Sequence, residues 1–379
     1  MGRLKARAAQ KRKQEQQQQQ ATFWPELCRR IAAGQVIPIV SNGVFFDQIF
    51  DIDSDGIIGV SAGEENPQGW SIEEQLADAW AEEIGFPLRG RQRLARVALY
   101  NRVVKSTDDR AARSSYLNWL KDALLFLAEH DPEVDPDTVK EQRDEIEQSS
   151  FVDIAAELGY LRPLKAQPDP LAQLARLKLP IYVTTSHFDF LERAIMANGR
   201  TPRTQICFWS GEPLRYAKDG HRTDYHFEPS VEQPLVYHLF GHEAYPESMV
   251  LTEDDYLDFL TAIARDAHQK EPLVPWDLRK ALAQSSLLLL GYRPRGWDFR
   301  IVFRGLIKNT PPGLRTDMVS LAVQIDPADQ QWVLAADDVR RYLEGYFQEK
   351  EKQLNFTVEY ATTGDFVAKL WEAWDQWRR

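Results

Sequence analysis

The stretch Pro234–Leu260 reads PLVYHLFGHEAYPESMVLTEDDYLDFL and contains a strand, a turn and a helix in succession. Its first residues, Leu235–Leu239, form a short apolar run typical of a buried strand, and Gly241 follows it. A helical pattern then covers Thr252–Ala267. The stretch therefore predicts a buried strand that ends in a small-residue turn and leads into a helix.

The same order of elements recurs along the chain. IYVTTSHFDFLERAI at Ile181–Ile195 and SSLLLLGYRPRGWDFRIVFRG at Ser285–Gly305 also run from an apolar strand through a polar turn into a helix. Strands that alternate with helices indicate an α/β fold with a Rossmann-like parallel sheet. Predicted strands lie at Val36–Val40, Pro180–Thr184, Ile206–Trp209, Leu235–Leu239, Ser286–Leu290, Met318–Ile325 and Phe356–Glu359.

Residues 45–165 contain mainly helical patterns, with Glu133–Glu147 expected as a solvated loop or an exposed helix. We therefore expect residues 22–310 to form one Rossmann-like domain with a helical insertion at about 45–165. Residues 311–379 are expected to be a C-terminal α/β extension, with a predicted helix Val339–Phe347 and a final helix Thr363–Trp377 whose aromatic stripe suits a core or an interface. Residues 1–21, basic and rich in glutamine, predict a disordered tail.

Composition narrows the classes of partner. Of 379 residues, 43% are hydrophobic, which suffices for a sizeable core. The net charge of -11 disfavours nucleic-acid binding by the body of the protein, although the basic tail could contact nucleic acid or an acidic partner. The longest apolar runs are too short to span a membrane, and two distant cysteines, Cys28 and Cys207, suit the reducing cytoplasm.

The sequence predicts no metal site. Asp51–Gly56 copies the opening of a calcium-binding EF-hand loop, but Ala62 stands where the loop needs a bidentate glutamate. No CxxC pair or HExxH motif is present. We expect Asp51–Gly56 to be a polar surface turn.

Taken together, the three quoted stretches resemble the zinc-free bacterial branch of the sirtuin-like (silent information regulator 2-like) domains, as found in anti-phage defence proteins. The resemblance extends over about residues 23–375. It implies NAD as substrate or ligand, bound at the carboxyl ends of the strands. Deacetylase sirtuins carry a four-cysteine zinc ribbon, which two cysteines cannot build, so protein deacetylation is not expected.

The resemblance places two turns against the cofactor. Ser41, Asn42 and Gly43 occupy the position of the family's glycine-rich loop, where backbone amides approach the diphosphate, although only Gly43 is a glycine. Gly291 and Tyr292 follow a later strand, at the turn that lies against the adenosine ribose in the family. We predict all five residues as cofactor contacts.

A third turn, Thr184–Asp189, resembles the family's TTN-x-D segment. The asparagine that contacts the nicotinamide ribose in the family is replaced, by Ser186 in one alignment and by His187 in another. Ser186 and His187 are therefore catalytic candidates, although His187 could also be a packed loop residue. Thr184, Thr185 and Asp189 are predicted cofactor contacts.

A fourth turn carries the largest departure from the family. The family's catalytic histidine falls at Phe240, whose ring can stack on a ligand but cannot transfer a proton. His238, two residues earlier, is expected to share a face with Phe240 and is either a catalytic residue or structural. Phe240 and Gly241 are predicted to contact the cofactor, and His242 is expected to be exposed. Thr252 and Asp255 resemble a helix capping box and are given no chemical role.

Two functions follow from the resemblance. The first is an NAD- or ADP-ribose-binding protein of bacterial anti-phage defence with degenerate catalytic motifs and weak or no hydrolysis. The alternative is an active NAD hydrolase that converts NAD to nicotinamide and ADP-ribose and depletes NAD on infection. Because relatives often form oligomers or act beside other proteins, self-association and a partner from a defence operon are also expected.

Overall fold

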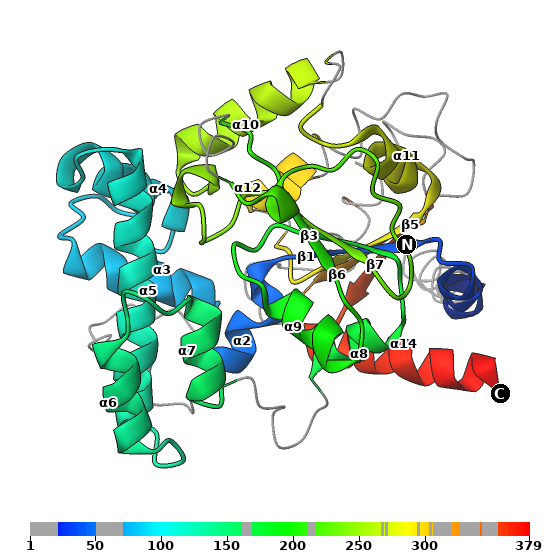
Figure 1. The fold of residues 1–379 in the computed structure, drawn as a ribbon, viewed down its shortest axis with the longest axis horizontal. Coiled ribbons are helices and arrows are strands. Elements are labelled where there is room, and N and C mark those ends of the chain that lie inside the picture. The colour runs from blue at the N-terminus through cyan, green and yellow to red at the C-terminus, as the bar shows by residue number, and fades with distance from the viewer. Residues whose placement is uncertain are drawn as a thin grey trace, which may run out of the picture.

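The computed structural model contains a parallel sheet with helices packed on both of its faces (Figure 1). This arrangement confirms the predicted α/β, Rossmann-like fold class. The structure describes residues 22–50, 71–160, 169–210, 217–266, 269, 272–293, 296–302, 305, 320–325, 342 and 355–379. The predicted tail at residues 1–21, the turn Asp51–Gly56 and nearly all of the predicted helix Val339–Phe347 lie outside the described residues.

The sheet has seven strands in the described part of the chain, in the order β3-β4-β2-β1-β5-β6-β7, and all neighbouring strands are parallel. From β1 the chain passes to β2 on one side and later returns to β5 on the other side. Such a reversal beside a central strand creates a crevice for ligands in α/β sheets. The strands are β1 Val36–Val40, β2 Ile181–Thr184, β3 Arg203–Ile206, β4 Leu235–His238, β5 Ser286–Leu290, β6 Ser320–Ile325 and β7 Asn355–Tyr360.

The strands β1, β4 and β5 are buried along their whole length because helices cover both faces of the sheet. Val36 and Val40 of β1 pack into one hydrophobic cluster, with α8 (Pro170–Arg176), α9 (Phe190–Ala197) and α14 (Thr363–Arg378). Ile37 and Ile39 pack into a second cluster, with α10 (Glu253–Asp266), α11 (Trp276–Gln284) and α12 (Trp297–Ile301). Because side chains alternate along a strand, each of the strands β1, β2, β4 and β5 contributes to both clusters.

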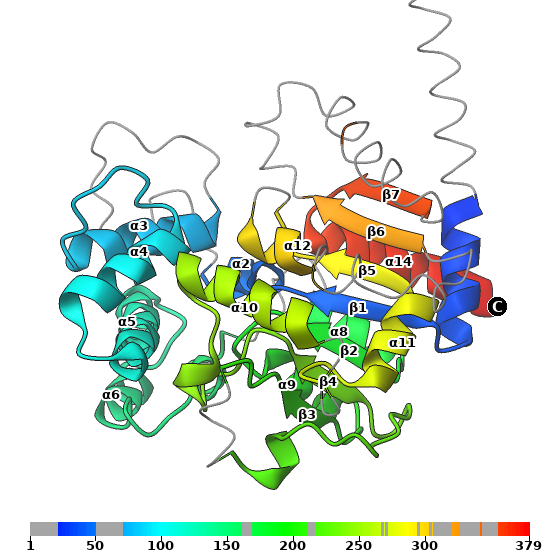
Figure 2. The same cartoon turned by 90° about the horizontal axis from the view of Figure 1, so that it is seen from above.

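A helical layer separates β1 from β2 in sequence and lies off the end of the sheet to which the strand arrowheads point (Figure 2). Phe46, Phe50 and Phe151 tie this layer into the first hydrophobic cluster. The layer therefore stands beside the carboxyl ends of the strands. It consists of η1 Asn42–Val44, α2 Phe46–Ile49, α3 Ile72–Glu83, α4 Leu94–Tyr100, η2 Asn101–Lys105, α5 Asp109–His130, α6 Pro136–Asp144 and α7 Phe151–Glu157.

One predicted strand is displaced. The strand predicted at Ile206–Trp209 is wrong, because β3 runs from Arg203 to Ile206. After Ile206 a single bond from the amide of Cys207 to the carbonyl of His238 precedes the departure of the chain from the sheet. Helix α11 begins at Trp276, because Pro275 occupies its N-cap position.

The C-terminal strands β6 and β7 continue the central sheet beyond β5. Helix α14 lies across the same face as α8, with Phe366 and Leu370 buried and Trp377 45% exposed. Of its aromatic stripe, Phe366 is in the core, Trp371 and Trp374 are partly buried against the core, and Trp377 is exposed. Two short helices, η4 Asp219–His221 and η5 Pro246–Ser248, complete the described elements. Within the described residues, no helix has the length and apolar character that a membrane span requires.

Candidate functional site

The four turns predicted from the sequence lie along one edge of the sheet. Strands β4, β2, β1 and β5 are neighbours, and Val40 is in register with Thr184 on one side and Leu290 on the other. Thr184 is in turn in register with His238. The turns that follow these strands therefore begin at the same level, at the edge where parallel sheets bind ligands.

The turns after β1 and β5 are in direct contact with each other. Gly291 has a φ of +76°, and a β-carbon there would lie 2.8 Å from the Oγ of Ser41 and from Val44. A β-carbon on Gly43 would lie 2.5 Å from the carbonyl oxygen of Gly291. The amide of Ser41 also donates to the carbonyl of Leu290 over 3.1 Å. Both glycines are therefore required by the contact between the two turns.

Hydroxyl groups connect the β2 turn to its neighbours. The hydroxyls of Thr185 and Tyr292 are 2.9 Å apart and hydrogen-bonded, and both side chains are buried. The hydroxyl of Thr184 donates to the carbonyl of Val40 over 2.9 Å. Thr184 thus stabilises the sheet, whereas Thr185 and Tyr292 link the β2 and β5 turns across the end of β1.

His238 forms a buried ion pair with Glu192, a residue of α9 that the sequence analysis did not single out. Its Nε2 donates to Glu192 over 2.7 Å, and its Nδ1 donates to the carbonyl of Ser186 over 3.0 Å. Burial lowers the pKa of His238, but Glu192 and the Ser186 carbonyl outweigh this effect and leave the pKa above its ordinary value. Both ring nitrogens are therefore committed to the protein.

The Ser186 side chain also serves the local fold. Its hydroxyl accepts the amide of Phe188 over 3.1 Å and is buried. This bond closes the turn that leads from β2 into α9. Ser186 therefore has a structural role at this position, whatever else it does.

His187 differs from the other two catalytic candidates. It is 5% exposed, and its Nδ1 has no hydrogen-bond partner in the part of the chain that the structure describes. Burial, together with the positive charges of His238 and Arg113, lowers the pKa of His187 to about 4. The imidazole is therefore neutral at pH 7 and able to accept a hydrogen bond or a proton.

Phe240 lies in the hydrophobic core on the α10 side of the sheet. It is 1% exposed, and its ring meets the rings of Tyr256 and Phe259 edge-on at 5.6 Å and 5.2 Å. The expectation that His238 and Phe240 share a face is wrong. Strand β4 ends at His238, so the alternation of side chains does not extend to position 240.

The turn after Phe240 is held by close backbone packing. Gly241 has a φ of +82°, and a β-carbon there would overlap the backbone of Ser248. The expectation that His242 is exposed is wrong. His242 is 8% exposed and its ring centroid lies 4.8 Å from that of His238, because its amide is bonded to the Ser248 hydroxyl and the chain folds back over it.

Two other predicted contacts retain polar atoms that lack a protein hydrogen bond. The Oδ1 atoms of Asn42 and Asp189 are buried and have no hydrogen-bond partner among the described residues. Asp189 lies 3.8 Å from Arg193 as an ion pair at the start of α9. With the Nδ1 of His187, these are three buried polar atoms on two adjacent turns that have no hydrogen-bond partner among the described residues.

Two carboxyl groups near the β1 and β5 turns were not predicted. Burial raises the pKa of Glu73, with partial offset by Arg293 and by a hydrogen bond to Asn42. Burial and the proximity of Glu73 raise the pKa of Asp298 to about 7. Glu73 and Asp298 belong to α3 and α12, and their patterns looked only helical in the sequence.

These observations test how well the edge fits NAD. The atoms of Asn42, His187 and Asp189 that have no hydrogen-bond partner among the described residues suit the hydroxyl and amide groups of such a ligand. Glu73 and Asp298 repel a diphosphate when ionised, and Arg293 offsets them. The residues therefore fit NAD best when the two carboxyls are protonated. In the described ranges no group of three histidine, cysteine or acidic side chains is arranged to hold a metal ion.

The parallel sheet with helices on both faces defines a Rossmann-like α/β protein. Residues 180–350 match the family model of the SIR2-like domain, which supports the sirtuin-like family. The match covers β2 to β6 and includes three of the four turns. SIR2-like domains generally bind NAD. No curated protein matches the chain.

Proposed function

We propose that the chain binds NAD or an ADP-ribose-like ligand at the edge formed by the turns after β1, β2, β4 and β5, with weak or no hydrolysis. The observation that carries this proposal is a set of buried polar atoms, in Asn42, His187 and Asp189 on the adjacent β1 and β2 turns, that have no hydrogen-bond partner in the described part of the chain. The match of residues 180–350 to the SIR2-like domain supports NAD as the ligand class.

The residues have different parts in the proposed site. NAD supplies the bond between nicotinamide and ribose that the family cleaves. Ser41, Asn42 and Gly43 would face the diphosphate, and Gly291 and Tyr292 the adenosine ribose. The nicotinamide ribose would lie against Thr185, His187 and Asp189. Gly241 shapes the turn beside them.

The case against efficient hydrolysis rests on the candidates for proton transfer. Phe240 is in the core, the ring nitrogens of His238 are bonded to Glu192 and Ser186, and the Ser186 hydroxyl closes a turn. The alternative, an active NAD hydrolase, is favoured by one observation. His187 is neutral at pH 7 with a free Nδ1 and could act as a base.

Titration calorimetry with ADP-ribose and with NAD tests the binding. We expect saturable binding of both ligands by the parent and a loss of about tenfold in the Asn42→Ala variant, since one ligand contact is removed. Asn198→Ala, which alters an exposed asparagine at the end of α9, is the matched control. Absence of binding by the parent, or equal affinity in the two variants, would refute the proposed site.

For the cellular role we propose anti-phage defence in the bacterial cytoplasm. The resemblance to defence proteins and two buried, unpaired cysteines support this assignment. Self-association and a protein partner from the same operon belong to the proposal, as do the division at residue 310 and the basic tail as a contact for acidic partners. Phage plating on cells with and without the gene tests the role.

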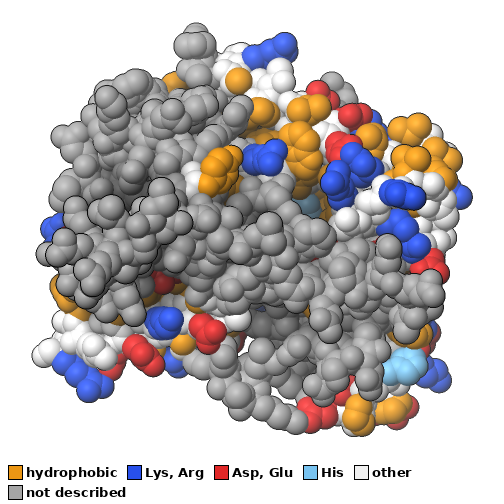
Figure 3. Space-filling model, turned by 180° about the vertical axis from the view of Figure 1, so that it is seen from behind, with side chains coloured by type: hydrophobic (Ala, Val, Ile, Leu, Met, Phe, Trp, Pro, Cys, Tyr) orange, Lys and Arg blue, Asp and Glu red, His pale blue; other side chains and the backbone are white. Residues whose placement is uncertain are grey.

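On the rear face, basic and acidic side chains lie among one another where the structure is described (Figure 3).

A further inference from the structure

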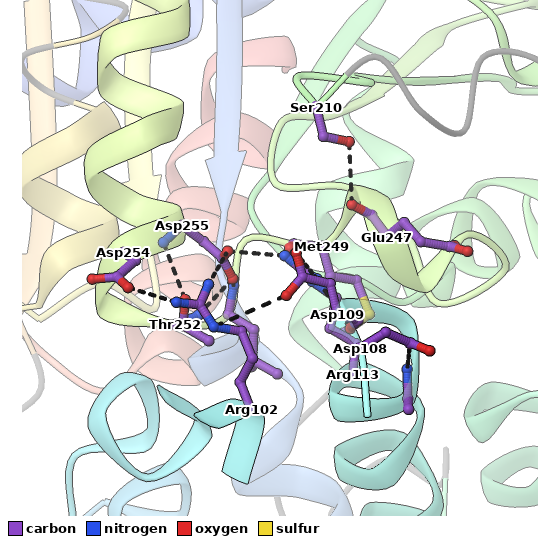
Figure 4. A network of polar contacts seen from close by, with 12 residues as sticks. Arg102, Asp108, Asp109, Arg113, Ser210, Glu247, Met249, Thr252, Asp254 and Asp255 are labelled. Carbon is purple, nitrogen blue, oxygen red and sulfur yellow. Dashed lines mark hydrogen bonds and ion pairs between the residues drawn. The ribbon is translucent and has the colours of Figure 1, made fainter. Parts of the chain in front are cut away.

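Arg113 is a buried arginine of the helical layer that reaches the Rossmann-like body (Figure 4). It is 3% exposed, and its Nε donates to the carbonyl of Met249 over 2.9 Å. One terminal nitrogen donates to the carbonyl of Asp109 over 3.1 Å, and the other to the carboxylate of Asp255 over 2.9 Å. The guanidinium thus joins α5 to the chain segment that precedes α10.

Asp255 extends this connection to the backbone. Its second oxygen accepts the amides of Leu251 and Thr252 over 3.1 Å and 2.8 Å. The Thr252 hydroxyl accepts the amide of Asp255 in return, which completes the predicted capping box. One buried carboxylate therefore binds Arg113 and the first turn of α10 at the same time.

The segment held by Arg113 supports the turn after β4. The amide of Val250 donates to the carbonyl of Phe240 over 2.9 Å, and the amide of His242 donates to the Ser248 hydroxyl over 3.0 Å. Gly241 lies against the backbone of Ser248. The bond from Arg113 to Met249 is consequently one residue away from the bond that positions Phe240.

Other arginines of the helical layer pair with the same acidic segment in a different way. Arg102 lies 2.6 Å from Asp254 and 3.8 Å from the Oδ1 of Asp255, and Arg96 lies 3.4 Å from Glu253. The pairs with Asp254 and Glu253 are partly exposed, and such pairs contribute little to stability. Arg96 provides the matched comparison for Arg113, because it carries the same charge and pairs with an acid of the same segment, but its pair with Glu253 is partly exposed.

We propose that Arg113 is a positioning residue of the ligand site that holds the Phe240–Gly241 turn in place. The part of this inference that concerns ligand binding rests on the proposed function, whereas the part that concerns the position of the turn does not. Loss of Arg113 removes the anchor of Met249 and leaves Asp255 without its buried partner. The turn then moves relative to the β2 turn that carries His187.

The test compares Arg113→Met with Arg96→Met. We expect amide hydrogen exchange at Val250 and His242 to accelerate about tenfold or more in Arg113→Met, because their bonds open more often. ADP-ribose should bind about tenfold more weakly to that variant. Arg96→Met should leave both quantities unchanged.

A separate readout concerns charge. Histidine proton shifts followed against pH should show a higher pKa for His187 in Arg113→Met than in the parent, whereas Arg113→Lys keeps the positive charge and should change this pKa less. A purely structural role would not produce this difference between the two variants.

Each outcome decides a separate point. A folded Arg113→Met protein with parental exchange at Val250 and His242 and a parental His187 pKa overturns the inference. If Arg113→Met does not fold, Asp255→Asn tests the same connection through the same amides. If the parent binds no ADP-ribose, the proposed function fails, and the exchange measurement still decides whether Arg113 positions the turn.

Discussion

The ring of Phe240 meets the ring of Phe259 edge-on, with centroids 5.2 Å apart and planes at 83°. This contact joins the turn after β4 to helix α10 inside the hydrophobic core. At the position where the sirtuin-like family that the sequence resembles carries a catalytic histidine, the chain therefore has a packed aromatic residue. The proposal of weak or no hydrolysis uses this contact, since a phenylalanine packed in the core cannot transfer a proton.

Replacing Phe240 by histidine should destabilise the protein without creating hydrolysis. A buried imidazole beside Phe259 and Tyr256 would lack a hydrogen-bond partner, which costs about 2–3 kcal/mol. Urea unfolding measures this cost, with Phe240→Leu as an apolar control expected to lose less. Turnover of a fluorescent NAD analogue should stay low even when Ser186→Asn is added. A large rise in turnover would show that the turn still faces the ligand.

Alanine at Gly241 should be far more harmful than alanine at Gly199. Both glycines have positive φ, but a β-carbon at Gly199 meets open space, whereas one at Gly241 overlaps Ser248. The left-handed backbone alone costs about 1–2 kcal/mol. We therefore expect the free energy of unfolding to fall by about 1–2 kcal/mol in Gly199→Ala. In Gly241→Ala we expect a fall of at least about 3 kcal/mol, or no folding. Equal losses in thermal unfolding would contradict the packing of this turn.

The central strands could be predicted from the sequence because they are buried. Strands such as β1 and β5 are buried on both faces, so they appear in the sequence as short apolar runs between turn residues. Strand β3 is at the edge of the sheet and reads RTQI, which carries no such signal. The apolar residues that follow it, Cys207 and Phe208, pack from a loop and misled the prediction.

The candidate site was less predictable because tertiary contacts decide it. Small residues marked the turns, and the structure places those turns at one edge. The directions of the side chains depended on partners distant in sequence, such as Glu192 for His238 and Ser248 for His242. In the sequence, Asp255 has the pattern of a simple capping residue. In the structure it also binds Arg113, and a lone capping pattern gives no sign of such a distant arginine.

Replacing Glu192 by glutamine should have a pH-dependent effect on stability. The folded pKa of His238 is raised above its ordinary value of 6.5, so the pair contributes fully below pH 6.5 and loses its contribution as pH rises through the folded pKa. At pH 6 we expect the Glu192→Gln variant to lose about 3 kcal/mol of its free energy of unfolding, and this loss should shrink toward pH 9. Denaturant unfolding at several pH values measures it.

The control for this series is His226→Gln, which alters an exposed histidine. Its difference from the parent should be small at every pH. A loss in Glu192→Gln that is constant between pH 6 and pH 9 would show that His238 is not charged in the folded protein.

The affinity for ADP-ribose should fall as pH rises. Burial and Glu73 raise the pKa of Asp298 to about 7, so its carboxyl is largely protonated at pH 6 and ionised at pH 8.5. An anionic ligand is repelled by the ionised form, so we expect binding to weaken about three- to tenfold over this range. Asp298→Asn should flatten the dependence, and Asp258→Asn, at an exposed position of α10, should not. Tighter binding at pH 8.5 would contradict this electrostatic account.

Saturation-transfer difference NMR with NAD tests the central claim most directly, because one spectrum reports both binding and cleavage. Irradiation of the protein should transfer saturation to adenine and nicotinamide protons of intact NAD, and competition by ADP-ribose should abolish the transfer. The signals of free nicotinamide should grow slowly or not at all. Absence of transfer would contradict ligand binding, and rapid growth of free nicotinamide that His187→Ala abolishes would identify an active hydrolase.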